Sequence, residues 1–142
     1  MRASPRRFAD VTAGEELPSL RRTPTRLTLF LFGVSYWTAH RIHYDVEWAR
    51  SEGYDDVLVT ANLLSAYSAE LVTGWAGDAG CLRGLQERNV APALAGEALV
   101  VSGRVVELVP EREGGSVRCA LTVTKADGTV VTEGRATLRL PA

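Results

Sequence analysis

The feature that most constrains this fold is the segment Leu63 to Val72, in which small and apolar residues go most of the way round a helix. A helix of this kind needs cover on all sides, unlike a surface helix with one apolar stripe. A chain of 142 residues is long enough to supply that cover in one domain without disulfides or metal. The rest of the chain must therefore provide a surface that encloses this helix.

The C-terminal part of the chain predicts that surface, because apolar and polar residues alternate along it. Strands are expected at about 82–90, 98–109, 117–124 and 129–140, with turn signals at 113–115 and 126–128. A sheet of at least four hairpin-connected antiparallel strands must bury one face, so we expect it to wrap the apolar helix. The fold class is α+β, and a face or edge is left to pair with a second copy.

The N-terminal third of the chain is expected to be less regular. Residues 1–24, rich in proline and charge, are predicted to form an irregular lead-in with at most one short strand, so that the domain spans 25–142. Thr25 is expected to cap a helix that ends near Tyr36 and Trp37, and its apolar residues recur at the helical spacing: Leu27, Phe30, Leu31 and Val34. Asp45 is expected to cap a short helix over 46–52, which ends at Gly53.

Both histidines of the chain, His40 and His43, lie in the loop between these two helices, close to Asp45. Histidine is the side chain that accepts and returns a proton most readily near neutral pH. This clustering predicts a chemical site. The alternative is that a histidine here is a buried structural residue, bonded to a backbone carbonyl.

Composition excludes several classes of partner. A net charge of −1 gives no basic surface for nucleic acid or an anionic membrane. No apolar run approaches the roughly 20 residues of a membrane span, and no signal peptide is recognisable, so we expect a cytoplasmic protein. Cys81 and Cys119 have no second ligand at a metal-binding spacing, which predicts free thiols and no metal site. Without a glycine-rich phosphate loop, no cofactor is implied.

The run from Tyr36 to Asp45, which contains His-Arg-Ile-His-Tyr-Asp, resembles the MaoC-like hotdog family, as do Trp48 to Tyr54 and Val57 to Val59. This family includes (R)-specific enoyl-CoA hydratases and 3-hydroxyacyl-thioester dehydratases. The motifs cover residues 23–98, and the strand pattern covers the rest. The resemblance implies a single hotdog fold, an acyl-CoA or acyl carrier protein thioester as substrate, and a place in fatty acid or polyketide metabolism. It also implies a homodimer or a hotdog heterodimer.

The resemblance assigns roles to particular positions. His43 matches the family's catalytic base, and Thr38 stands where the family carries Asp or Asn to share the reacting water. The threonine hydroxyl can hold a water, but it cannot act as an acid or base. The alternative is that Thr38 only caps the turn. The family's His-Gly dipeptide at the helix start is replaced by Thr60-Ala61. The backbone N–H of Ala61 or Asn62 is therefore expected to stabilise the thioester oxygen.

Other residues near the motif are weaker candidates for substrate binding. Arg41 is expected either to contact a phosphate of coenzyme A or of a phosphopantetheine arm, or to be solvated. His40 is expected to orient the loop or to bond the backbone. The aromatic residues Tyr36, Trp37 and Trp48 are interpreted as core or dimer contacts, one of which could line an acyl pocket.

The sequence therefore predicts hydration of an enoyl thioester or dehydration of a 3-hydroxyacyl thioester. One alternative is an accessory hotdog subunit of a heteromer, in which the altered Thr38 and Ala61 mark lost activity. Another is altered thioester chemistry. A thioesterase would need a carboxylate such as Glu70, the only acid of the apolar helix, whereas a different nucleophile such as an amine would add to the same enoyl group.

Overall fold

The structure, a computed structural model, describes residues 5–142. Its helices are α1 (Arg26–Ser35), α2 (Val46–Ser51) and α3 (Ala61–Ala76), with short helical turns at Phe8–Asp10, Arg41–His43 and Ala79–Cys81. Its strands are β1 (Glu16–Arg22), β2 (Leu82–Asn89), β3 (Leu99–Pro110), β4 (Gly115–Lys125) and β5 (Val130–Leu140).

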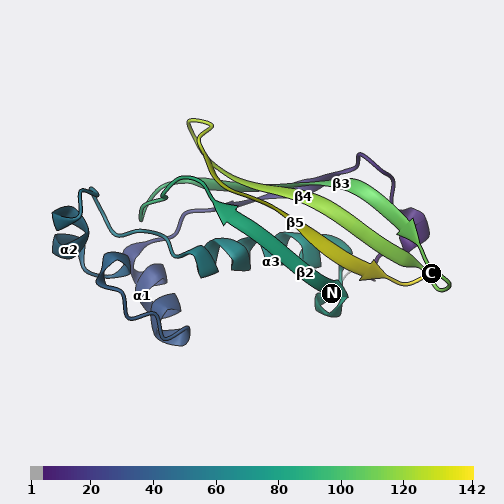
Figure 1. The fold of residues 1–142 in the computed structure, drawn as a ribbon, viewed down its shortest axis with the longest axis horizontal. Coiled ribbons are helices and arrows are strands. Elements are labelled where there is room, and N and C mark those ends of the chain that lie inside the picture. The colour runs from purple at the N-terminus through teal and green to yellow at the C-terminus, as the bar shows by residue number, and fades with distance from the viewer. Residues whose placement is uncertain (1–4) are drawn as a thin grey trace.

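The five strands form one antiparallel sheet in the order β1-β3-β4-β5-β2, and the sheet curves over α3 (Figure 1). The predicted α+β arrangement, a sheet wrapped around a central apolar helix, is thus confirmed. Strand β1 comes from the N-terminal lead-in and pairs with β3, so the lead-in contributes one edge of the sheet. Strand β2 forms the other edge.

Helix α3 begins and ends as its sequence predicts. The hydroxyl of Thr60 accepts a hydrogen bond from the Leu63 N–H, and Gly77 ends the helix in the left-handed conformation at φ 71°. Its buried residues lie on several sides of the helix: Leu63, Leu64, Tyr67, Ser68, Leu71, Val72 and Ala76. Each fully buried leucine stabilises the fold by about 1.5–3 kcal/mol, so α3 forms the centre of the core.

Helix α1 has a different environment. It lies with α2 beyond the end of the sheet (Figure 1), and only Leu29 and Gly33 of its residues are buried. Its predicted cap is confirmed, since Thr25 accepts a hydrogen bond from the Thr28 N–H. The apolar residues at helical spacing are all more than half exposed: Leu27, Phe30, Leu31 and Val34.

The aromatic residues of this region also lie outside the core. Tyr36, Trp37 and Trp48 are exposed, so of the two expected roles, core contact or dimer contact, the structure excludes a place in the core of this chain. The reason is the position of α1 and α2, which lie beyond the end of the sheet (Figure 1). The expected dimer contacts stay a prediction.

The N-terminal lead-in is fastened to the far end of α3. Arg6 pairs with Glu15 at 2.6 Å and lies over the Trp75 ring, whose Nε1–H donates to Glu15 at 3.1 Å. Burial raises the pKa of Glu15, but hydrogen bonds from Arg6, Trp75 and the Thr12 N–H outweigh burial and lower it. This group, Arg6, Glu15 and Trp75, is called the N-terminal clasp below.

Within residues 5–142, none of the helices is both long and apolar enough for a membrane span.

Candidate active site

The site is organised by the extended segment Val57–Val59, which is hydrogen-bonded on both sides. On one side, Val57 accepts from the Ala95 N–H at 3.0 Å and Val59 donates to Ala93 at 2.8 Å. On the other side, the Leu58 N–H donates to the Ile42 carbonyl at 3.0 Å. Since Val57 and Val59 are buried, this segment ties the histidine loop to the core immediately before α3 begins.

The same segment fixes the ring of His43. The His43 Nδ1 lies 2.9 Å from the Leu58 carbonyl oxygen. A carbonyl only accepts hydrogen bonds, so Nδ1 must carry the proton, and in the neutral imidazole the lone pair is then on Nε2. Nε2 forms no hydrogen bond to any other residue in 5–142. The imidazole is thus held in the tautomer that a general base requires.

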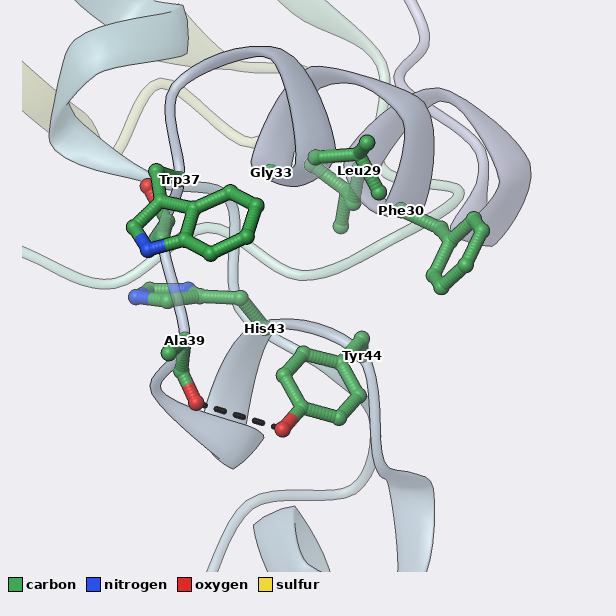
Figure 2. A pocket seen from close by; sticks show the side chains of 9 residues that line it. Leu29, Phe30, Gly33, Trp37, Ala39, His43 and Tyr44 are labelled. Atoms are coloured by element: carbon green, nitrogen blue, oxygen red, sulfur yellow. Dashed lines mark hydrogen bonds between the residues drawn. The ribbon is translucent and has the colours of Figure 1, made fainter.

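His43 lines a cavity of about 250 Å³ between α1 and the histidine loop. The other lining residues are mostly apolar: Leu29, Phe30, Gly33, Val34, Trp37, Thr38, Ala39 and Tyr44. In the view of Figure 2 the Trp37 indole lies over the His43 imidazole, with Leu29 and Phe30 of α1 to one side. Among the described residues, the structure therefore brings His43 and Thr38 together in one cavity, as the sequence predicts for the base and its water-holding partner.

Thr38 follows an unusual helix end. Its N–H donates to the Gly33 carbonyl at 2.8 Å, and the Trp37 N–H donates to Val34 at 3.2 Å. This pair of bonds ends a helix with a left-handed residue, which is usually glycine. Here that residue is Trp37, at φ 54°. The Thr38 hydroxyl makes no hydrogen bond within residues 5–142, so it is free to hold a water or a substrate atom.

The N-terminus of α3 supplies unpaired donors close to this segment. Ala61 and Asn62 are exposed, and neither backbone N–H has an acceptor within residues 5–142, as is usual for the first residues of a helix. Leu58, whose carbonyl holds His43, precedes Ala61 by only three residues. The partial positive charge of the helix end therefore lies close in sequence to the segment that holds His43. Neither Ala61 nor Asn62 is among the residues that line the cavity, so their expected contact with the thioester oxygen stays a prediction.

The remaining motif residues mainly support the loop. Arg41 pairs with Asp45 at 2.6 Å and lies over the Trp48 ring, and it does not line the cavity. Asp45 caps α2 by accepting from the Trp48 N–H, as predicted, and the hydrogen bonds from Arg41 lower its pKa. His40 also lies outside the cavity lining. Its carbonyl accepts from the His43 N–H, and its ring lies edge-on to the His43 ring at 5.9 Å.

Glu70, the acid considered for a thioesterase, lies outside the cavity lining and pairs with Arg22. Sequence reasoning did not assign Tyr44 to the cavity, although it lies within the histidine motif. The Tyr44 hydroxyl donates to the Ala39 carbonyl at 3.2 Å, and this bond closes the loop beside the cavity (Figure 2). The adjacency of Tyr44 to His43 was the available signal. In residues 5–142, no three His, Cys, Asp or Glu side chains gather in a way that would hold a metal.

Solved structures share this architecture. R-hydratase PhaJ1 from Pseudomonas aeruginosa, in its unliganded form, matches with a TM-score of 0.86 and 21% identity over 95% of this chain and 85% of that one. The (R)-hydratase from A. caviae involved in PHA biosynthesis matches with a TM-score of 0.84 and 16% identity over 93% and 98%. The ChsH1-ChsH2 complex from Mycobacterium tuberculosis matches with a TM-score of 0.82 and 19% identity over 91% and 98%.

These similarities show that the fold is the hotdog fold. Among curated protein sequences, none matches the chain. The family model for hydroxyacyl-thioester dehydratase type 2 matches residues 3–95, a range that contains α1, the histidine loop and the whole of α3. The resemblance predicted from the motif is thus confirmed, and the chain belongs to the hydroxyacyl-thioester dehydratase type 2 family, within the MaoC-like hotdog proteins.

Proposed function

We propose that this protein adds water to a 2-enoyl thioester, and catalyses the reverse dehydration of a 3-hydroxyacyl thioester, with His43 as the general base and acid. The observation that carries the proposal is the hydrogen bond between His43 Nδ1 and the Leu58 carbonyl, because it leaves Nε2 free to take a proton. Family membership supports the reaction class.

In the hydration direction, His43 Nε2 takes a proton from a water held by the Thr38 hydroxyl, while the water oxygen bonds to C3 of the substrate. The electron pair of the C2–C3 double bond moves toward the thioester carbonyl, whose oxygen becomes an enolate oxygen. The N–H groups of Ala61 and Asn62 stabilise this charge. The imidazolium then returns its proton to C2, so the balance is one water added across one double bond.

The altered residues fit this scheme with a lower rate. Alanine at position 61 offers the same backbone N–H as glycine. Thr38 orients the water but cannot share in proton transfer, because a hydroxyl is neither a useful acid nor a base at neutral pH. His43 must therefore carry both proton transfers. Arg41 stays a predicted contact of the carrier arm, and His40 is expected mainly to orient the loop; both lie outside the cavity lining.

The test is a mass-resolved assay of the purified protein on crotonyl-CoA, on 3-hydroxybutyryl-CoA and on longer acyl thioesters carried by coenzyme A or acyl carrier protein. Wild type should gain or lose one water, and His43→Ala should lower the rate by about 10²–10⁴ because it removes the acid and base. His40→Ala is the matched comparison, since it removes a neighbouring imidazole that does not line the cavity. Its reaction rate should be less than about tenfold below that of wild type.

Several outcomes would contradict the proposal. An unchanged rate in His43→Ala would remove His43 from the chemistry. Release of the free thiol would identify a thioesterase, and a product without added water would identify another nucleophile. No turnover by the folded wild type on any thioester would favour the alternative that the protein is an accessory subunit of a heteromer.

A further inference from the structure

Trp37 is the residue whose conformation is least explained by the fold. Seven of the described residues have positive φ, and the other six are glycine: Gly14, Gly53, Gly77, Gly96, Gly114 and Gly128. Trp37, at φ 54°, is the only one with a side chain. A side chain in the left-handed region is strained because its Cβ approaches the following carbonyl oxygen. The comparable end of α3 uses Gly77 and avoids this strain.

Two backbone hydrogen bonds close the helix end around Trp37, but no hydrogen bond, ring stack or cation–π contact of its side chain within residues 5–142 offsets the strain. The indole is 89% exposed, the largest exposed fraction of any large apolar side chain described. It forms no hydrogen bond, no ring stack and no cation–π contact with another described residue, although other aromatic residues of the chain do. Strained residues of this kind tend to lie at ligand sites.

The position of the indole indicates what it contacts. Trp37 lines the same cavity as His43 and Thr38, and Figure 2 shows its ring on the side of the imidazole that faces α1. The lining continues along α1 through Phe30 and Val34, whose exposed side chains extend it to the surface. Apart from His43 and Tyr44, no residue of this lining has an ionisable side chain.

We infer that Trp37 determines substrate specificity by forming the outer wall of the acyl site, and that the acyl group is an extended, uncharged hydrocarbon chain. This inference rests on the proposed function, because the thioester places the acyl chain next to His43. The chain then runs along Trp37, Phe30 and Val34. A terminal carboxylate would be unpaired in this lining, so dicarboxylic acyl groups are disfavoured.

The experiment measures binding of saturated thioesters by calorimetry, because these cannot be hydrated and report binding without turnover. Octanoyl-CoA and octanoyl-acyl carrier protein are compared with butyryl-CoA, and butyryl-CoA with succinyl-CoA. Trp37→Gly should weaken octanoyl binding at least tenfold on whichever carrier the wild type accepts, and butyryl binding less than threefold. Wild type should bind succinyl-CoA at least tenfold more weakly than butyryl-CoA.

Three controls separate binding from folding. Trp37→Gly should melt at the same temperature as wild type or higher, since glycine relieves the strain. Trp37→Asn provides a second variant, because asparagine tolerates this conformation better than most residues do. Tyr36→Ala is the matched control, since it removes the adjacent exposed aromatic ring, which does not line the cavity. It should leave octanoyl binding unchanged.

The inference is overturned if both Trp37 variants bind octanoyl thioesters as tightly as wild type, or if succinyl-CoA binds as tightly as butyryl-CoA. A lower melting temperature with unchanged binding would make Trp37 a structural contact and would also overturn it. If wild type shows Trp37-dependent binding but hydrates no enoyl thioester, the proposed reaction fails while the acyl site stands. If wild type hydrates crotonyl-CoA but its binding does not depend on Trp37, only the acyl site fails.

Discussion

Helices α1 and α3 lie in the same domain, yet they have opposite relations to solvent. Helix α3 is buried under the sheet and ends at a glycine, whereas α1 lies beyond the sheet, exposes most of its apolar residues and ends at a strained tryptophan. The core around α3 can be explained by packing alone. The environment of α1 cannot, because most of its apolar residues gain little from folding. Under the proposed function, the sheet and α3 provide stability, while α1 and the histidine loop surround the reacting groups.

The most direct test of this difference between α1 and α3 is to truncate one leucine in each helix and compare the free energies of unfolding. Leu64, on α3, is 2% exposed, whereas Leu31, on α1, is 56% exposed. Leu64→Ala should lower the free energy of unfolding by about 2–5 kcal/mol, because it leaves a cavity in the core. Leu31→Ala should change it by less than about 0.5 kcal/mol. Urea denaturation at several protein concentrations measures both. A large, concentration-dependent loss in Leu31→Ala would show that a second chain covers α1.

A smaller effect is expected at the N-terminal clasp, which lies at the end of α3 far from the site. Glu15→Gln should cost about 1–3 kcal/mol of unfolding free energy at pH 7, because charge-assisted hydrogen bonds are lost. The folded-state pKa of Glu15 is lowered, so its contribution is full above the ordinary value of 4.5 and disappears as the pH falls through the folded-state value.

Denaturation of wild type and Glu15→Gln between pH 3 and pH 7 measures this difference. The gap in stability should be constant down to about pH 5 and should shrink below it. Since the clasp serves only the stable region, the kcat of folded Glu15→Gln should equal that of wild type. A gap that widens in acid would contradict the lowered pKa.

The smallest expected effect tests the site region of this comparison, at the hydroxyl of Thr38. Thr38→Val keeps the shape of the side chain but removes the hydroxyl, and it should lower kcat by about threefold to tenfold, the equivalent of one hydrogen bond of ~0.5–1.5 kcal/mol. Unfolding free energy should change by less than about 0.5 kcal/mol. Thr38→Asn is the matched variant, since its amide can hold the water and should retain or raise the rate. Equal rates in all three proteins would show that Thr38 does not position the water.

The sequence predicted the regions where local chemistry and tertiary packing agree. Strand alternation from residue 98 onward, the two glycine turns and the caps at Thr25 and Asp45 all have local causes, and each is found in the structure. The surroundings of α1 had no local signal, because an apolar face at helical spacing looks the same whether a sheet covers it or not. For that reason the sequence left core and dimer contact open for Trp37 and Trp48, and the structure excludes the core alternative.

The site was predictable in part. The pairing of Thr38 with His43 in one cavity follows from the motif, whereas the bond from His43 to the Leu58 carbonyl joins residues 15 positions apart and has no signature in side-chain type. The cavity wall along α1 was equally hidden, since it depends on how the helix packs against the loop. The strain at Trp37 depends on a backbone angle that composition does not reveal.

The peptide unit of Leu58 has a consequence for how proteins with this site can vary. The His43 ring is oriented by a main-chain carbonyl, which every amino acid carries, and the donors proposed for the thioester oxygen are main-chain amides as well. Substitutions around the site can therefore change the shape and polarity of the substrate pocket without disturbing the proton acceptor. Under the proposed function, such an arrangement keeps the base and the amide donors despite the replacements at positions 38 and 61, and substrate range is then the property most easily altered by mutation.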